Sequence, residues 1–118
     1  MKNKNFLHGV RHALAGLCLA LRTEKNFTVY LFHILVTLPL NLLMGFSVTE
    51  HLIWGVCVLG VFSAECANTA IERLCNFLTE AYNEQIKSIK DIAAGAVCCW
   101  GIAFYAAELI MLGMNLFA

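Results

Sequence analysis

The sequence predicts an all-α integral membrane protein with an N-terminal amphipathic surface helix and three transmembrane helices. Of the 118 residues, 60% are hydrophobic and 14% are charged, and the mean hydropathy is +0.73. Soluble domains usually have a smaller apolar share and a larger charged share. Three apolar runs are each long enough to cross about 30 Å of hydrocarbon. We therefore expect a single membrane-embedded domain over residues 1–118.

The first expected element is a surface helix at about residues 5–22. Between Phe6 and Leu21 apolar residues recur at helical spacing, whereas most of the charged and imidazole side chains fall on other faces. This pattern is typical of a helix that lies in the membrane interface. The alternative is a helix packed on the surface of the protein itself.

The transmembrane helices are expected at about 27–48, 52–75 and 92–117. Between the first two we expect a tight polar turn, Thr49-Glu50-His51. Between the last two, residues 79–90 are polar and charged, and this connection is expected to be partly helical.

Four residues inside these spans are unusual for a membrane helix. Pro39 and Asn41 are expected to kink the outer half of the first transmembrane helix. His33 fits a packed or hydrogen-bonded histidine better than a metal ligand. Glu108 lies towards the outer interface and is interpreted as interfacial or structural.

The net charge is zero, so no overall basic field favours nucleic acid as a partner. All basic residues precede the first transmembrane helix or lie between the second and the third: Lys2, Lys4, Arg11, Arg22, Lys25, Arg73, Lys87 and Lys90. The positive-inside rule then places the N-terminus in the cytoplasm and the C-terminus outside. About 25 mixed residues precede the first long apolar run, so no cleavable signal peptide is expected. The six cysteines show no zinc spacing and are expected to be free thiols.

A polar stripe interrupts the second transmembrane helix. Glu65, Asn68, Thr69, Glu72 and Asn76 are spaced so that all fall on one helical face. Ionisable groups in membrane helices are costly and usually mark a functional site or a polar contact between helices. At 1.5 Å per residue, Glu65 is about 10 Å deeper in the membrane than Glu72.

The stripe has the chemistry of a phosphoryl-transfer site at the cytoplasmic interface. Carboxylates such as Glu72 suit Mg²⁺, which is often held by one or two carboxylates and substrate phosphates. Glu24 is a further carboxylate on the same side, and Lys90 can balance phosphate charge. The deeper Glu65 would act as a base. No phosphate-binding loop or protein-kinase motif is present, so a soluble nucleotide-binding fold is not expected.

Two other functions remain open from the residues alone. Glu65 and Glu72 could form the proton relay of a small transporter or channel subunit, although the polar groups cluster in the cytoplasmic half. The polar groups could also serve only helix packing, a reading that fits Asn68 and Thr69 better than two carboxylates.

Residues 64–72 read Ala-Glu-Cys-Ala-Asn-Thr-Ala-Ile-Glu, and residues 90–97 read Lys-Asp-Ile-Ala-Ala-Gly-Ala-Val. These strings, together with Arg-Thr-Glu-Lys-Asn-Phe at 22–27, resemble the prokaryotic diacylglycerol kinase family, which includes undecaprenol kinases. The resemblance covers nearly the whole chain. It implies a homotrimer in a bacterial plasma membrane, with composite active sites between neighbouring subunits at the cytoplasmic interface.

The resemblance also implies a role for each matching residue. Glu65 matches the general base that activates the lipid hydroxyl, and Asn68 matches an asparagine that lines the site. Glu24 and Glu72 match the carboxylates that bind Mg²⁺–ATP. Lys90 and Asp91 match the nucleotide-binding pair.

The sequence departs from the family pattern at two positions. Asn76 stands where the family usually has a nucleotide-binding aspartate, and Asn83 stands where histidine is common. We interpret both as tuning of nucleotide binding. The segments at 22–27 and 68–73 look more like the undecaprenol kinases, so undecaprenol is the favoured substrate and diacylglycerol the alternative.

Overall fold

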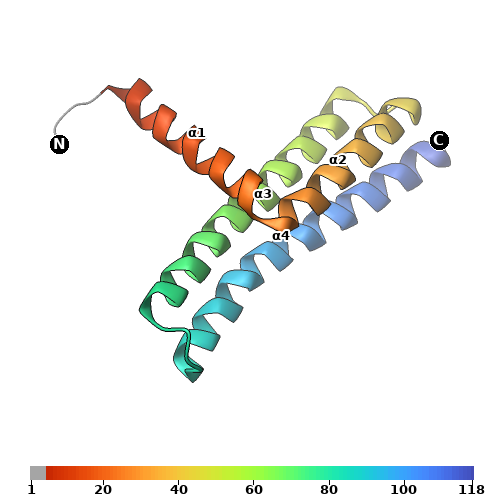
Figure 1. The fold of residues 1–118 in the computed structure, drawn as a ribbon. Helices are drawn as coiled ribbons and strands as arrows, with labels where there is room; N and C mark the ends of the chain where they lie inside the picture. Colours follow the sequence, from red (N-terminus) through yellow and green to blue (C-terminus); the bar gives the residue numbers. More distant parts are fainter. Residues whose placement is uncertain (1–4) are drawn as a thin grey trace.

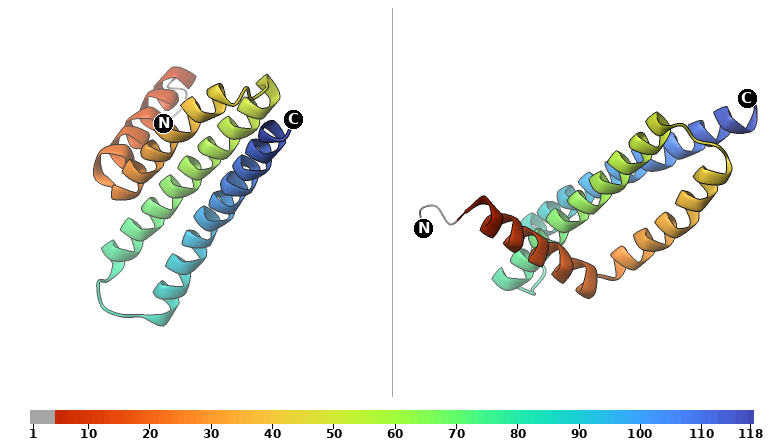
Figure 2. Two further views of the ribbon diagram at one scale, coloured as in Figure 1. Left: turned by 90° about the vertical axis from the view of Figure 1, so that its right-hand side faces the viewer. Right: turned by 90° about the horizontal axis from the view of Figure 1, so that it is seen from above.

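The structure, a computed structural model, describes residues 5–118 and contains four α-helices in that range. The helices are α1 (Phe6–Thr23), α2 (Lys25–Leu43), α3 (Val48–Leu78) and α4 (Glu84–Leu116). Helices α2, α3 and α4 run alongside one another, while α1 ends where α2 begins and lies across the bundle direction (Figures 1 and 2). The all-helical fold is confirmed. Lys2 and Lys4, which we expect on the cytoplasmic side, lie outside the described residues.

Three of the helices are long and apolar enough to cross a membrane, namely α2, α3 and α4. Helix α3, with 31 residues, is 12 residues longer than the 19-residue α2, or about 18 Å at 1.5 Å per residue. A short turn joins the end of α2 to the start of α3, so the extra length lies at the other end of the bundle. There the hairpin of α3 and α4 extends beyond the start of α2 (Figure 1).

The α3–α4 hairpin packs around a small apolar core of Cys57, Val61 and Phe104. Gly60 lies in this interface, and the ring of Trp100 occupies the space where a Cβ atom at residue 60 would stand. Glycine is therefore required there by close packing, since any side chain would displace the indole ring.

Two boundaries predicted from the sequence are wrong. The first transmembrane helix does not reach residue 48, because α2 ends at Leu43 and Gly45 turns the chain with a φ of 76°. Residues 49–51 are not a turn but belong to the first turn of α3. Ser47 and Glu50 form a capping box, in which each side chain accepts a hydrogen bond from the backbone N–H of the other.

The connection at 79–90 is partly helical, as predicted, because α4 already begins at Glu84. The side-chain oxygen of Asn83 accepts hydrogen bonds from the backbone N–H groups of Gln85 and Ile86 and so caps the helix. This asparagine therefore has a local structural role as well as a place in the loop beside the candidate site.

Other sequence-based expectations concern isolated polar residues. His33 is hydrogen-bonded as expected, with Nδ1 2.8 Å from the carbonyl oxygen of Val29 and Nε2 2.6 Å from the hydroxyl of Tyr105. Glu108 is only 6% exposed and accepts a hydrogen bond of 3.2 Å from the fully buried Asn41, which favours its structural interpretation. The six cysteines are free thiols, but only Cys57 and Cys75 are buried in the isolated chain.

Candidate active site

The polar stripe lies on α3 at the level where α2 begins. Glu65, Asn68 and Thr69 are buried, Glu72 is half-buried, and Asn76, closest to the end of the helix, is exposed. Burial thus decreases towards the end of α3 that extends beyond α2. The stripe leads from the interior of the bundle to the solvent-exposed loop between α3 and α4.

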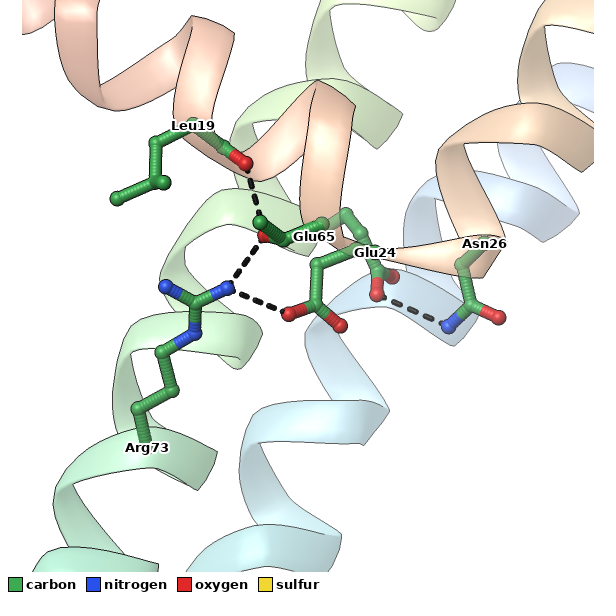
Figure 3. A network of polar contacts seen from close by, with 6 residues as sticks. Leu19, Glu24, Asn26, Glu65 and Arg73 are labelled. Atoms are coloured by element: carbon green, nitrogen blue, oxygen red, sulfur yellow. Dashed lines mark hydrogen bonds and ion pairs between the residues drawn. The ribbon is translucent and has the colours of Figure 1, made fainter.

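Glu65 is the most deeply buried carboxylate of the stripe, with 2% of its surface exposed. Asn26 Nδ2 donates a hydrogen bond of 3.0 Å to Oε1 (Figure 3). The Tyr30 hydroxyl donates one of 3.0 Å to Oε2. Both donors come from α2, one helical turn apart. They fix the orientation of the carboxylate at the point where α2 and α3 meet.

A carboxylate oxygen can accept more than one hydrogen bond. Each oxygen of Glu65 therefore keeps acceptor capacity for a substrate hydroxyl while its protein donors hold it in place. Within residues 5–118 no lysine or arginine forms an ion pair with Glu65.

The sequence analysis did not identify Asn26 and Tyr30. Their spacing of four residues places them on one face of α2, and this is the signal that could have identified them. The spacing alone does not reveal which residue of α3 they face, because that depends on how the two helices are aligned.

Glu24 lies at the corner between α1 and α2, where its extended backbone interrupts the two helices. Its Oε1 atom is 2.8 Å from Nη2 of Arg73, the residue that follows Glu72 on α3. The same Nη2 atom donates a hydrogen bond to the Thr23 hydroxyl, which in turn donates to the carbonyl oxygen of Leu19 (Figure 3). The polar network thus joins both sides of the corner to α3.

Next to this network, Asn68 Nδ2 lies 3.4 Å from Oε1 of Glu72, a long hydrogen bond. Two buried atoms of the stripe, Asn68 Oδ1 and Thr69 Oγ1, have no hydrogen-bond partner in the described chain. Buried polar atoms are rarely left unpaired in folded proteins. Both atoms are therefore unfilled hydrogen-bonding positions within the stripe.

Glu24 and Glu72 are the predicted metal ligands, and Glu24 pairs with Arg73, the residue that follows Glu72 on α3. Each forms a side-chain hydrogen bond through Oε1, while Oε2 has no protein donor in residues 5–118. Across these residues no group of three His, Cys, Asp or Glu side chains is arranged to hold a metal ion. Two carboxylates with free oxygens are nevertheless a donor set that Mg²⁺ accepts when phosphates supply further oxygens.

Nearer the end of α3, Lys90 Nζ donates a hydrogen bond of 2.7 Å to Asn76 Oδ1. Asp91 instead pairs with Lys87, at 2.7 Å along the same helix, so Lys90 and Asp91 do not pair with each other. These four residues line a polar hollow of about 410 Å³ beside the α3–α4 loop, which also contributes Tyr82.

On the opposite side of Glu65, a small cavity of about 50 Å³ lies between α2, α3 and α4. Its wall includes the rings of Tyr30, Phe62, Phe104 and Tyr105. The polar tips of Tyr30 and Tyr105 are already hydrogen-bonded, to Glu65 and to His33 respectively. The cavity is therefore mainly apolar, and it is connected to the buried carboxylate through Tyr30, which lines it and donates to Glu65.

Comparison with known proteins covers most of the chain. The model of the prokaryotic diacylglycerol kinase family matches residues 11–112. The chain is similar to undecaprenol kinase of Bacillus subtilis (strain 168), with 34% identity over 99 residues that cover 84% of this chain and 77% of that protein. It is also similar to diacylglycerol kinase of Synechocystis sp., with 30% identity over 100 residues that cover 84% of this chain and 57% of that protein. No solved structure matches the chain.

Proposed function

Because the chain belongs to the prokaryotic diacylglycerol kinase family, we propose that it transfers the γ-phosphoryl group of ATP, with Mg²⁺, to a lipid hydroxyl at the cytoplasmic membrane interface. Family membership confirms the prediction of a lipid kinase and implies ATP as the phosphate donor. It favours this activity over the transporter and helix-packing alternatives. The observation that carries the assignment of the site is the buried Glu65, held by Asn26 and Tyr30 beside an apolar cavity.

In this proposal Glu65 acts as the general base. It accepts the proton of the lipid hydroxyl as the hydroxyl oxygen attacks the γ-phosphorus of ATP, and ADP leaves. The hydrogen bonds from Asn26 and Tyr30 keep the carboxylate in one orientation, so its free lone pairs face the substrate. The unpaired oxygens of Asn68 and Thr69 are available to orient the lipid headgroup.

Glu24 and Glu72 are the proposed Mg²⁺ ligands, because each keeps one carboxylate oxygen without a protein donor. When bound, Mg²⁺ would neutralise the charge of the transferring phosphates. In a single chain these residues form no three-residue metal cluster. This agrees with a site that is completed by nucleotide phosphates and by a neighbouring subunit of the proposed homotrimer.

The polar hollow at the α3–α4 loop is the proposed nucleotide site, with Lys90, Asp91 and Asn76 on its wall. An aspartate at position 76 would neutralise Lys90, whereas the neutral Asn76 holds the ammonium group through a hydrogen bond and leaves its charge uncompensated. We therefore interpret Asn76 as an adjustment that keeps Lys90 oriented and positive for phosphate.

Undecaprenol is the proposed lipid, and diacylglycerol is the alternative. Apart from its hydroxyl group, undecaprenol is a hydrocarbon, whereas diacylglycerol also carries two ester groups. The cavity beside Glu65 is lined by aromatic and aliphatic side chains, and the hydroxyls of Tyr30 and Tyr105 are already in use. A lipid without ester oxygens leaves fewer polar atoms unsatisfied in such surroundings.

The proposed location is the bacterial plasma membrane, with α1 on its cytoplasmic surface and the C-terminus outside. The basic residues of the described chain all lie at one end of the bundle: Arg11, Arg22, Lys25, Arg73, Lys87 and Lys90. Apolar side chains of α1, among them Phe6, Leu7 and Leu14, are exposed and would enter the interface.

A lipid-by-lipid assay tests the function. Purified protein in lipid–detergent micelles receives radiolabelled ATP and Mg²⁺ with either undecaprenol or diacylglycerol at equal mole fraction. We expect label in undecaprenyl phosphate, with a lower rate for diacylglycerol. Faster phosphorylation of diacylglycerol would reverse the substrate assignment, and transfer to neither lipid would refute the proposed activity.

A further inference from the structure

Arg73 lies in the site region, but the proposed reaction gives it no role. It follows Glu72 on α3, and its guanidinium reaches across to the corner between α1 and α2. One terminal nitrogen, Nη2, donates to Glu24 on one side of that corner and to Thr23 on the other (Figure 3). A guanidinium terminal nitrogen carries two N–H groups, so both are used.

These contacts give little stability by themselves, since the side chains of Arg73 and Glu24 are 46% and 27% exposed. Exposed ion pairs are screened by water and usually contribute little to folding. The contact does, however, fix the side chain of a residue that belongs to neither helix. Glu24 is the single residue between two helices, and its backbone is extended rather than helical.

The contact also leaves Glu24 able to bind a cation. Arg73 occupies Oε1, whereas no donor within residues 5–118 contacts Oε2. A guanidinium is planar and rigid, so it orients a carboxylate with little loss of side-chain freedom per hydrogen bond. The carboxylate is thus held with one oxygen turned to the arginine and the other available.

We infer that Arg73 is a positioning residue for the metal site: it holds Glu24 against α3, beside Glu72, and thereby sets the affinity for Mg²⁺. The inference rests on the proposed function, in which Glu24 and Glu72 bind the metal. It adds that a residue outside the metal ligands sets the affinity for Mg²⁺, because it holds the Glu24 carboxylate at the corner between α1 and α2.

The test uses Mn²⁺ as a spectroscopic substitute for Mg²⁺ and needs no turnover. Full-length protein in lipid–detergent micelles, with a non-hydrolysable ATP analogue, is titrated with Mn²⁺, and free Mn²⁺ is measured by electron paramagnetic resonance. For Arg73→Ala we expect half-saturation at a concentration about tenfold higher than for the wild type. Its thermal unfolding temperature should change little. Arg22→Ala removes the guanidinium that precedes Thr23, which has no partner within residues 5–118, and should bind Mn²⁺ as the wild type does.

Two further variants separate positioning from general anchoring. In the double variant Arg73→Ala/Glu24→Gln, Mn²⁺ affinity should be no lower than in Glu24→Gln alone, because Arg73 acts through Glu24. Thr23→Val breaks the contact to α1 but keeps the Arg73–Glu24 pair, and its affinity should stay close to that of the wild type. Arg73→Lys keeps the charge and should recover part of the affinity.

The outcomes distinguish this inference from the function on which it rests. Unchanged Mn²⁺ affinity in Arg73→Ala, additive losses in the double variant, or an equal loss in Thr23→Val would each overturn the positioning role. If Glu24→Gln itself binds Mn²⁺ like the wild type, the proposed metal site is wrong.

Discussion

Replacing Glu65 by glutamine separates its proposed role as a base from its role in the fold. The carboxylate is 2% exposed and accepts hydrogen bonds from Asn26 and Tyr30. Glutamine has nearly the same shape, and its amide oxygen can still accept the Tyr30 hydrogen bond. Asn26 can rotate its amide group and accept from the glutamine nitrogen, so both contacts survive. The change therefore removes the proton acceptor and preserves the packing.

General-base catalysis typically contributes about 10² to 10⁴ in rate, so we expect kcat of Glu65→Gln to fall at least about a hundredfold. The measurement is phosphate transfer from labelled ATP to undecaprenol, accompanied by nucleotide binding, which should be retained. Glu108→Gln is the matched control, because Glu108 is also a buried carboxylate hydrogen-bonded to an asparagine, yet lies at the other end of the bundle. If Glu65→Gln keeps more than about a tenth of the wild-type rate, Glu65 is not the base.

Three further substitutions test the fold and the metal site. Gly60→Ala should destabilise the α3–α4 interface by about 1–3 kcal/mol, because the new methyl group overlaps the Trp100 ring. In the control Gly55→Ala the new methyl group meets no neighbour, so the stability should not change. Equal melting temperatures of the two variants in detergent would contradict this prediction. Glu72→Gln should raise the Mg²⁺ concentration for half-maximal activity while leaving the KM for lipid nearly unchanged, and an unaltered Mg²⁺ titration would exclude it as a ligand. Asn41→Ala leaves a buried carboxyl group without its donor and should cost about 1–3 kcal/mol in chemical denaturation, without loss of specific activity in the folded fraction.

Periodicity within each helix was sufficient to predict the polar stripe. A helix places residues three and four apart on one face whatever surrounds it, so Glu65, Asn68 and Glu72 were identified without knowledge of their neighbours. The three membrane spans followed equally from local hydropathy. The predicted position of the turn between α2 and α3 is wrong because Ser47 and Glu50 form a capping box. This capping box starts α3 at Val48, so residues 49–51 are helical.

Contacts between helices were not predicted, because they depend on how neighbouring helices are aligned and rotated relative to each other. The residue pattern within one helix does not show this. Asn41 and Glu108 are separated by 67 residues, and each looked like an isolated irregularity until the fold paired them. Arg73 was counted only as part of the cytoplasmic charge, and its contact with Glu24 appears only once α3 is placed beside the α1–α2 corner.

From the length of α2 we predict that bilayer thickness affects the proposed reaction. Its 19 residues span about 28 Å, close to the hydrocarbon thickness of an average bilayer. The corner at Glu24 therefore lies at the membrane surface only when the two lengths match. A thicker bilayer draws this corner into the hydrocarbon, and a thinner one tilts the helix. Turnover should therefore peak with phospholipids of intermediate acyl length and fall on either side, although the acyl chains take no part in the chemistry.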